Sequence, residues 1–237
     1  EQFRVILSEP TFYQLLAKSL AWTSVNVIGH VAFGVLLAML LSGRVLGKSL
    51  FRTLLILPWA MPQYISALTW RGMFNYEYGA VNLILKQWLH LPAVPWLSDP
   101  FWAFCAPIIT NIWLGFPFMM VVALGGLTAI PKELYEAADL DGAGGWQKFR
   151  YVTMPLMRGS IGFVLIMSTI KSFQVFGQVY VMTGGGPMNS TMVLVYYIYR
   201  QAFEFYRSGY ASAIAWFLFA VILVLTMLQK TFLKAEN

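Results

Sequence analysis

The chain alternates long apolar stretches with short polar ones. Because the hydrocarbon core of a bilayer is about 30 Å thick, roughly 20 mainly apolar residues are needed for one helix to cross it. Five stretches reach this length, and they cover residues 19–41, 54–74, 101–127, 159–182 and 210–228. Two shorter apolar runs, 81–91 and 192–205, are expected to lie at the membrane interface. The pattern predicts an all-α, polytopic membrane helix bundle with at least five spans in this chain.

The composition supports a membrane protein. Hydrophobic residues make up 59% of the 237 residues and charged residues 11%, whereas a typical soluble domain is about 45–50% apolar and about 25% charged. The net charge of +6 is also typical of nucleic-acid-binding proteins. In so apolar a chain, basic cytoplasmic loops explain it better. We therefore expect lipid, and no nucleic acid, around this chain.

The basic residues set the expected orientation. They gather after the first, third and last apolar stretches, at Arg44, Lys48, Arg52, Lys132, Lys148, Arg150, Arg158, Lys230 and Lys234. Short loops rich in Lys and Arg usually stay in the cytoplasm, so the C-terminus is expected inside. Five spans then put Glu1 outside. Because the sequence starts without Met and shows no signal peptide, residues 1–237 are expected to be one transmembrane domain with further spans upstream.

The longest polar stretch, residues 128–158, is predicted to form a cytoplasmic elbow. Pro131 suits the first turn of a helix, where its missing N–H breaks no hydrogen bond. Gly142 is expected to end this helix, and a second short helical turn should follow and end at Pro155. The small side chains of Ala137 and Ala138 would let the backbone of another protein approach closely.

The spacing inside the elbow resembles a known loop. Segment 136–155, with the sequence EAADLDGAGGWQKFRYVTMP, resembles the EAA loop of ABC importer permeases, although Val152 and Met154 stand where that loop usually has Ile and Leu. Three further motifs extend the resemblance to the maltose-type (carbohydrate uptake) permeases over nearly the whole chain: LILPWAMP at 55–62, NIWLGFP at 111–117 and TGGGP at 183–187.

The resemblance implies a permease subunit of an ATP-driven sugar importer in the bacterial cytoplasmic (inner) membrane, carrying a disaccharide or oligosaccharide such as maltose or trehalose. It also implies the partners: a second homologous permease, two ATPase subunits that bind ATP and Mg²⁺, and an extracytoplasmic sugar-binding protein. No cofactor is expected in this chain. The residues implied to couple the permease to the ATPase are Glu136, Ala137, Ala138, Asp141 and Gly142. An importer of another small solute, such as a sugar phosphate, is the alternative.

The same resemblance implies a substrate site halfway across the membrane. The matching positions are Asn111, Leu114, Gly115, Phe118, Trp59, Gln63, Ser168, Lys171 and Ser172. Amides and hydroxyls would bind sugar hydroxyls, and Gly115 would let the ligand approach the backbone. Phe118 and Trp59 replace tyrosines of the maltose permease, and Lys171 replaces a phenylalanine. The sugar therefore stays open, and an anionic sugar is one alternative.

Lys171 is the only charge well inside an expected span. A charged side chain is costly at the bilayer centre, so Lys171 is expected either to face the translocation path or to extend to the outer interface. Gln174 and Gln178 follow Lys171 in the sequence. Their side chains could serve helix packing or line the translocation path, and both interpretations stay open.

The sequence supports an enzymatic function less well than a transport function. Ser168 and Lys171 could form a Ser-Lys pair of an intramembrane hydrolase, but the chain shows no clear oxyanion loop. Segment 43–49 resembles a P-loop with one residue too few between its glycines, and it joins two spans rather than a strand and a helix. His30 and His90 have no metal-ligand spacing. Asn26 and His30, one helical turn apart, are expected to hydrogen-bond to a neighbouring helix. We expect no metal and no enzyme.

Overall fold

The structure is a computed structural model that describes residues 2–43 and 46–235. The regular structure in this part of the chain is helical. Its elements are α1 (Gln2–Ser8), α2 (Pro10–Ser42), α3 (Lys48–Ala60), α4 (Gln63–Met73), α5 (Ala80–Gln87), α6 (Pro100–Thr128), α7 (Lys132–Leu140), α8 (Gly145–Lys148), η1 (Phe149–Thr153), α9 (Met154–Leu156), α10 (Arg158–Phe173), α11 (Gly177–Met182), α12 (Leu194–Tyr199), η2 (Arg200–Glu204) and α13 (Ser208–Ala235). η1 and η2 are short π-helices. Glu1 and Arg44, used above for the orientation, lie outside the described residues.

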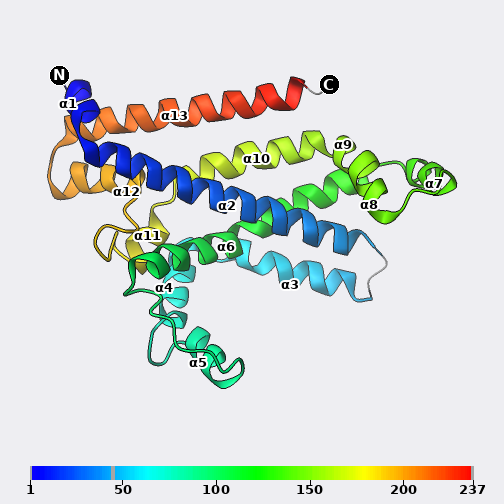
Figure 1. Cartoon of the computed structure of the whole chain (residues 1–237), viewed down its shortest axis with the longest axis horizontal. Coiled ribbons are helices and arrows are strands. Elements are labelled where there is room, and N and C mark those ends of the chain that lie inside the picture. The colour runs from blue at the N-terminus through cyan, green and yellow to red at the C-terminus, as the bar shows by residue number, and fades with distance from the viewer. Residues whose placement is uncertain (1, 44–45, 236–237) are drawn as a thin grey trace.

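Helices α2 and α6 pack along each other in the middle of the bundle, with α10 and α13 on one side and α3 on the other (Figure 1). Among the described residues, α2, α6 and the segment Ser208–Leu233 of α13 are long and apolar enough to cross a membrane. They contain three of the predicted spans. A fourth candidate is α10 together with the preceding Gly145–Leu156, at a bend of 70°. The all-α membrane bundle is thus confirmed, but the count of at least five spans is not.

The predicted span 54–74 is divided into two helices, α3 and α4. At the break, Met61 and Pro62 have ψ angles of 138° and 129°, which are extended rather than helical. The cause is Pro62, because a proline ring drives the residue before it out of the helical region. The predicted span 159–182 is also divided, between the end of α10 at Phe173 and the start of α11 at Gly177.

The loops expected on one side of the membrane share one end of the bundle. The C-terminal ends of α2 and α13, the N-terminal end of α3, and the elbow with α7, α8 and α9 all lie at the same end in Figure 1. The opposite end holds α1, α12 and the two short helices α4 and α5. This separation agrees with the distribution of basic residues along the sequence.

Two buried apolar clusters lie toward opposite ends of α2. One contains Trp22 and joins α2 to α10, α12 and α13, and the other contains Ala38 and joins α2 to α6. Between these two positions α2 carries Asn26 and His30, which are 0% and 5% exposed. The packing therefore changes from apolar to polar in the middle of the bundle.

The two shorter apolar runs form short helices. Run 81–91 holds most of α5, which lies beside α4 outside the main bundle (Figure 1). There Asn82 is buried and bonds the backbone of Tyr76 and Val94 and the indole of Trp96, at 3.0–3.1 Å. Run 192–205 holds α12 and η2.

Candidate functional site

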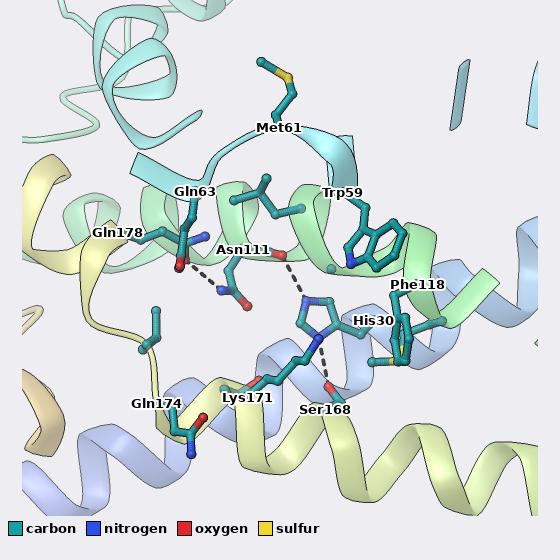
Figure 2. Close-up of a pocket in the computed structure, with 15 residues that line it drawn as sticks. His30, Trp59, Met61, Gln63, Asn111, Phe118, Ser168, Lys171, Gln174 and Gln178 are labelled. Carbon is teal, nitrogen blue, oxygen red and sulfur yellow. Dashed lines mark hydrogen bonds between the residues drawn. The ribbon is translucent and has the colours of Figure 1, made fainter. Parts of the chain in front are cut away.

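A cavity of about 360 Å³ lies in the polar middle of the bundle, between α2, α3, α4, α6, α10 and α11 (Figure 2). We call it the pocket. It is lined by His30, Trp59, Met61, Gln63, Asn111, Leu114, Gly115, Phe118, Met119, Ser168, Lys171, Ser172, Gln174, Val175 and Gln178. All nine residues that the resemblance proposed for a substrate site are among them. Six lining residues were not assigned to that site: His30, Met61, Met119, Gln174, Val175 and Gln178.

The two broken helices frame the pocket. Trp59 and Gln63 stand on either side of the break between α3 and α4, and Met61 lies within it. Gln174 and Val175 lie in the break between α10 and α11, and Gln178 follows it. A continuous helix would pack its side chains closely against its neighbours at these positions. The two breaks interrupt that packing and leave room for the cavity.

His30 links three helices across the pocket. Its Nε2 lies 3.0 Å from the carbonyl oxygen of Asn111 on α6, and its Nδ1 lies 2.9 Å from Oγ of Ser168 on α10. A carbonyl only accepts, so Nε2 donates, and a neutral imidazole then accepts the Ser168 hydroxyl at Nδ1. The predicted contact of His30 with a neighbouring helix is confirmed. For Asn26 the prediction is wrong, since its Nδ2 donates to Trp22 of its own helix at 2.8 Å.

Asn111 bonds across the pocket, and three buried polar atoms around it are unpaired. Its Nδ2 donates to Oε1 of Gln178 at 2.7 Å, which joins α6 to α11. Three buried atoms of the pocket have no hydrogen-bond partner among the described residues: Oδ1 of Asn111, Oγ of Ser172 and Nε2 of Gln178. Such atoms are rare in protein interiors unless water or a ligand satisfies them.

Gly115 faces the His30 ring rather than open space. A Cβ built at position 115 would lie 2.7 Å from both Cδ2 and Cε1 of His30. Real side-chain contacts do not come so close, so the glycine is what allows the imidazole to reach Asn111. The family resemblance predicts that a ligand approaches the backbone at Gly115, whereas the structure places the His30 side chain there.

An aromatic pair and a cation form another part of the wall. The rings of Trp59 and Phe118 are 6.1 Å apart at an interplanar angle of 33°. Nζ of Lys171 lies 4.8 Å from the centroid of the Phe118 ring, which is within the range of cation–π attraction. Figure 2 shows the Lys171 side chain extending from α10 into the pocket. Two orientations were expected for Lys171, one toward the translocation path and one toward the outer interface. In the structure its side chain faces the cavity.

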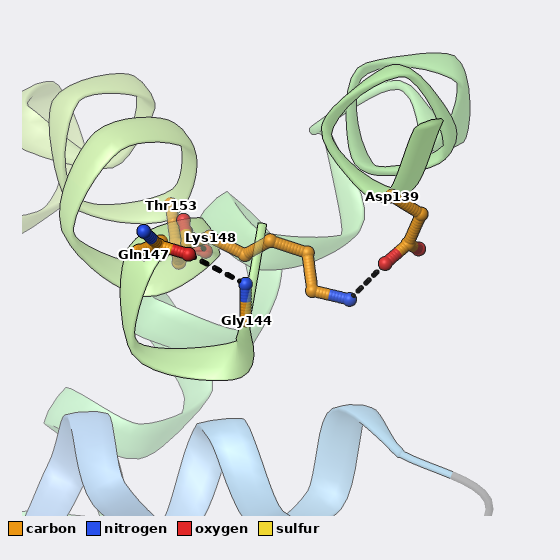
Figure 3. A network of polar contacts seen from close by, with 5 residues as sticks. All are labelled: Asp139, Gly144, Gln147, Lys148 and Thr153. Atoms are coloured by element: carbon orange, nitrogen blue, oxygen red, sulfur yellow. Dashed lines mark hydrogen bonds and ion pairs between the residues drawn. The ribbon is translucent and has the colours of Figure 1, made fainter. Parts of the chain in front are cut away.

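The elbow, residues 128–158, has the predicted helix–glycine–helix form. Helix α7 ends at Leu140, and Gly142 has a φ of +75°, a value that L-amino acids with a side chain rarely adopt. Helix α8 follows, with Gln147 accepting a bond from the backbone N–H of Gly144 at 2.7 Å and Lys148 paired with Asp139 at 2.6 Å (Figure 3). No residue of α7 is buried.

The end of the elbow differs from the prediction. Pro155 was expected to stop the second turn, but the helical path continues through η1 and α9 to Leu156. Pro155 stands in the first turn of α9, where a proline loses no intrahelical bond. The path then bends by 70° into α10. The elbow is therefore directly continuous with a helix that lines the pocket.

The rival enzymatic readings gain no support from the geometry. Ser168 bonds His30, while Lys171 faces Phe118. The P-loop-like segment 43–49 includes residues outside the described part, and α3 begins within it, at Lys48. Within residues 2–43 and 46–235, no three His, Cys, Asp or Glu side chains are grouped so that they could hold a metal ion.

The chain combines long apolar helices, a central polar pocket and a helical elbow exposed at one end. This architecture is typical of a membrane transport permease. This defines the class of the protein. The chain belongs to the family of binding-protein-dependent transport system inner membrane components, whose family model matches residues 30–235. It is therefore an integral membrane protein and the transport subunit, not the ATPase, of an ABC importer.

Curated relatives match the chain over almost its full length. The sulfoquinovosyl glycerol transport system permease protein SmoG of Agrobacterium fabrum is 36% identical over 237 residues, which cover 100% of this chain and 77% of that protein. The trehalose/maltose transport system permease protein MalF of Thermococcus litoralis is 37% identical over 225 residues, covering 94% and 75%. The predicted relationship to maltose-type permeases is confirmed.

Solved structures agree on the fold. A subunit of a bacterial ABC transporter that imports the acidic polysaccharide alginate superposes with a TM-score of 0.87 at 24% identity, covering 99% of this chain and 82% of that one. The MetNI methionine ABC transporter in inward-facing conformations gives a TM-score of 0.64 at 18% identity, covering 97% and 99%. Both likenesses show the ABC importer permease fold.

Proposed function

We propose that this chain forms the translocation path for a disaccharide or oligosaccharide in an ATP-driven importer of the bacterial cytoplasmic membrane. One observation carries the proposal: the nine residues that the family motifs select, from four helices, line a single pocket. The relatives are named for the transport of trehalose and maltose and of sulfoquinovosyl glycerol, which supports a sugar as substrate.

The chemistry of the pocket suits a sugar. A pyranose ring presents hydroxyls along its edge and C–H bonds on its faces. Oδ1 of Asn111 can accept from a hydroxyl, Nε2 of Gln178 can donate to one, and Oγ of Ser172 can do either. The tilted rings of Trp59 and Phe118 offer an apolar surface for a C–H face.

The proposed partners are a second homologous permease, two ATPase subunits that bind ATP and Mg²⁺, and an extracytoplasmic sugar-binding protein. The family description itself names a binding protein, and a solved relative was crystallised with a periplasmic protein holding an alginate pentasaccharide. On the elbow, Leu140, Trp146 and Tyr151 are 74–90% exposed. Exposed apolar side chains at a charged surface favour a protein partner there.

The path from the elbow to the pocket gives a route for coupling. Closure of the ATPases on ATP would move α7 and α8. Since the helical path from α8 continues through one bend into α10, that movement would reach Ser168, Lys171 and Ser172. A change in their position relative to α6 would open the pocket to one side of the membrane and close it to the other.

The test is transport by the complete complex in liposomes. The permease pair, the ATPases and the cognate binding protein are reconstituted, and uptake of radiolabelled trehalose, maltose, longer oligosaccharides and acidic sugars is measured with and without internal ATP. ATP-dependent uptake of at least one sugar is expected, with stimulation of ATP hydrolysis by the loaded binding protein. Uptake of none of them would contradict the proposal.

The orientation has its own test. The basic loops predict a cytoplasmic C-terminus. Green fluorescent protein and alkaline phosphatase are fused separately after Asn237. Fluorescence without phosphatase activity is expected, since the first reporter folds in the cytoplasm and the second only outside it. The reverse pattern would contradict the proposed orientation of the elbow and of the pocket.

A further inference from the structure

The pocket contains one fixed positive charge and no carboxylate. None of its fifteen lining residues is Asp or Glu, and its titratable side chains are those of His30 and Lys171. His30 is 5% exposed, and both of its ring nitrogens are engaged within the protein, one with the carbonyl oxygen of Asn111 and one with the hydroxyl of Ser168. The ammonium group of Lys171 is therefore the charge that a substrate meets.

Lys171 has no anionic partner in the part of the chain that the structure describes. Its Nζ stands over the Phe118 ring, and within the described residues it forms no ion pair with a carboxylate. The side chain is exposed, and it extends into the pocket (Figure 2). A ligand that enters the pocket can therefore reach the ammonium.

The surroundings strengthen the effect of this charge. Apolar helices form the walls of the pocket, although its side at Trp59 and Met61 is exposed. A cleft lined by one sign of charge between walls of low dielectric constant concentrates its field on a ligand. A lysine inside a membrane span is also costly unless water, a carbonyl or an anion stabilises it. A neutral substrate would displace water from the ammonium without replacing its charge interaction.

The remaining polar groups fit the uncharged part of the ligand. Gln178 and Ser172 are each 1% exposed, and each has a buried polar atom without a partner among the described residues. Oδ1 of Asn111 is unpaired in the same part of the chain. These atoms suit hydroxyl groups, whereas the Lys171 ammonium suits an anionic oxygen.

We propose that the pocket selects a sugar that carries one anionic group, and that Lys171 binds this group. The inference rests on the proposed function and narrows its substrate class. Two other arrangements are outcomes of the test: a neutral sugar whose hydroxyl accepts from Lys171, and a carboxylate of the second permease that neutralises Lys171 in the complex.

The experiment compares matched pairs of substrates that differ in one anionic group. The reconstituted complex is tested with a glucuronate-containing disaccharide against its glucose counterpart, sulfoquinovosyl glycerol against glucosyl glycerol, and trehalose 6-phosphate against trehalose. The three pairs separate carboxylate, sulfonate and phosphate. KM for uptake is measured for each. The affinity of the separate binding protein for each sugar is measured in parallel, since Lys171 variants do not change that protein.

Lys171→Met removes the charge and keeps the length of the side chain, and Lys171→Arg keeps the charge. For the preferred pair, K171M is expected to raise the ratio of the acidic KM to the neutral KM at least about tenfold, because a hydrogen bond to a charged group is lost. K171R is expected to keep this ratio within about threefold. The matched control is Lys86→Met, which removes a lysine that lies 5.6 Å from the Tyr76 ring, outside the pocket. It should leave the ratio unchanged.

An unchanged ratio in K171M would overturn the inference, as would a wild-type complex that prefers the neutral member of every pair. The wild-type comparison decides the matter if K171M and its polar substitute K171Q fail to assemble. Failure of the proposed function looks different, because then no member of any pair is taken up.

Discussion

In the pocket, His30, Asn111 and Ser168 come from three helices and are joined by hydrogen bonds of 2.9–3.0 Å. In the elbow, α7 has no buried residue, and the ion pair of Asp139 with Lys148 joins two parts of the elbow itself. The pocket is thus shaped by long-range contacts of this chain. The two ends of the elbow are anchored by Ile130 and Met157, which are buried in one apolar cluster with residues of α2 and α6. The part between them carries the exposed α7 and α8, so we expect the position of that part to depend on what docks against it.

This difference predicts two separate kinds of mutant. Changes in the pocket should alter uptake while the ATPases still co-purify with the permease. Changes that alter the shape of the elbow should release the ATPases while the pocket keeps its geometry.

Gly115→Leu should have the largest effect. A side chain at position 115 collides with the His30 ring, so it breaks the bonds of His30 to α6 and α10 and fills part of the pocket. Uptake in liposomes is expected to fall at least about a hundredfold, with co-purification of the ATPases kept. The matched control is Gly125→Leu on the same helix, because a Cβ there meets nothing within 4 Å. Equal loss in both variants would show a general effect on α6 rather than on the pocket.

Asn111→Ala should have the next largest effect. The variant removes the donor to Oε1 of Gln178 and an acceptor for the ligand. An unpaired buried group costs about 1–3 kcal/mol, so KM for uptake should rise by about ten- to a hundredfold. The control is Thr110→Val, since Thr110 donates only to Ala106 of its own helix. A normal KM in N111A would remove Asn111 from the substrate path.

The sequence predicted the residues of the pocket better than the backbone breaks and side-chain packing that bring them together. Trp59, Asn111 and Lys171 are far apart in the chain, and the family resemblance assigned them to one site. The breaks in two expected spans were missed, because average apolarity does not register the backbone effect of Pro62. The prediction that His30 hydrogen-bonds to a neighbouring helix was correct. Its place in the pocket was not predictable, since it follows from the absence of a side chain at Gly115.

The elbow was more predictable because its features are local. Pro131 at the start of α7 and Gly142 after its end follow from the backbone preferences of proline and glycine. The one error, at Pro155, arose because a proline can end a helix or occupy its first turn. The sequence does not distinguish these two roles of Pro155, because the bend before α10 depends on packing with the rest of the bundle.

Gly142→Val should weaken docking of the ATPases. At a φ of +75°, an L-residue costs about 1–2 kcal/mol, and a β-branched one costs more. Relief of this strain would turn α8 away from α7, so recovery of the ATPases with the tagged permease should fall about tenfold. Gly145→Val is the control, because its position is also open but lies in a helix. Release of the ATPases by both variants would attribute the effect to bulk rather than to backbone conformation.

Asp139→Asn should have the smallest effect, although its ion pair with Lys148 is short. The side chains of Asp139 and Lys148 are 59% and 27% exposed, and ion pairs this accessible usually contribute about 0.2–1 kcal/mol. Recovery of the ATPases should fall less than about threefold, and the difference from wild type should vanish in 1 M salt, where the Debye length is about 3 Å. If D139N instead releases the ATPases as fully as G142V does, then Asp139 binds the partner directly. The elbow would then be a charged recognition surface rather than a shape held by one glycine.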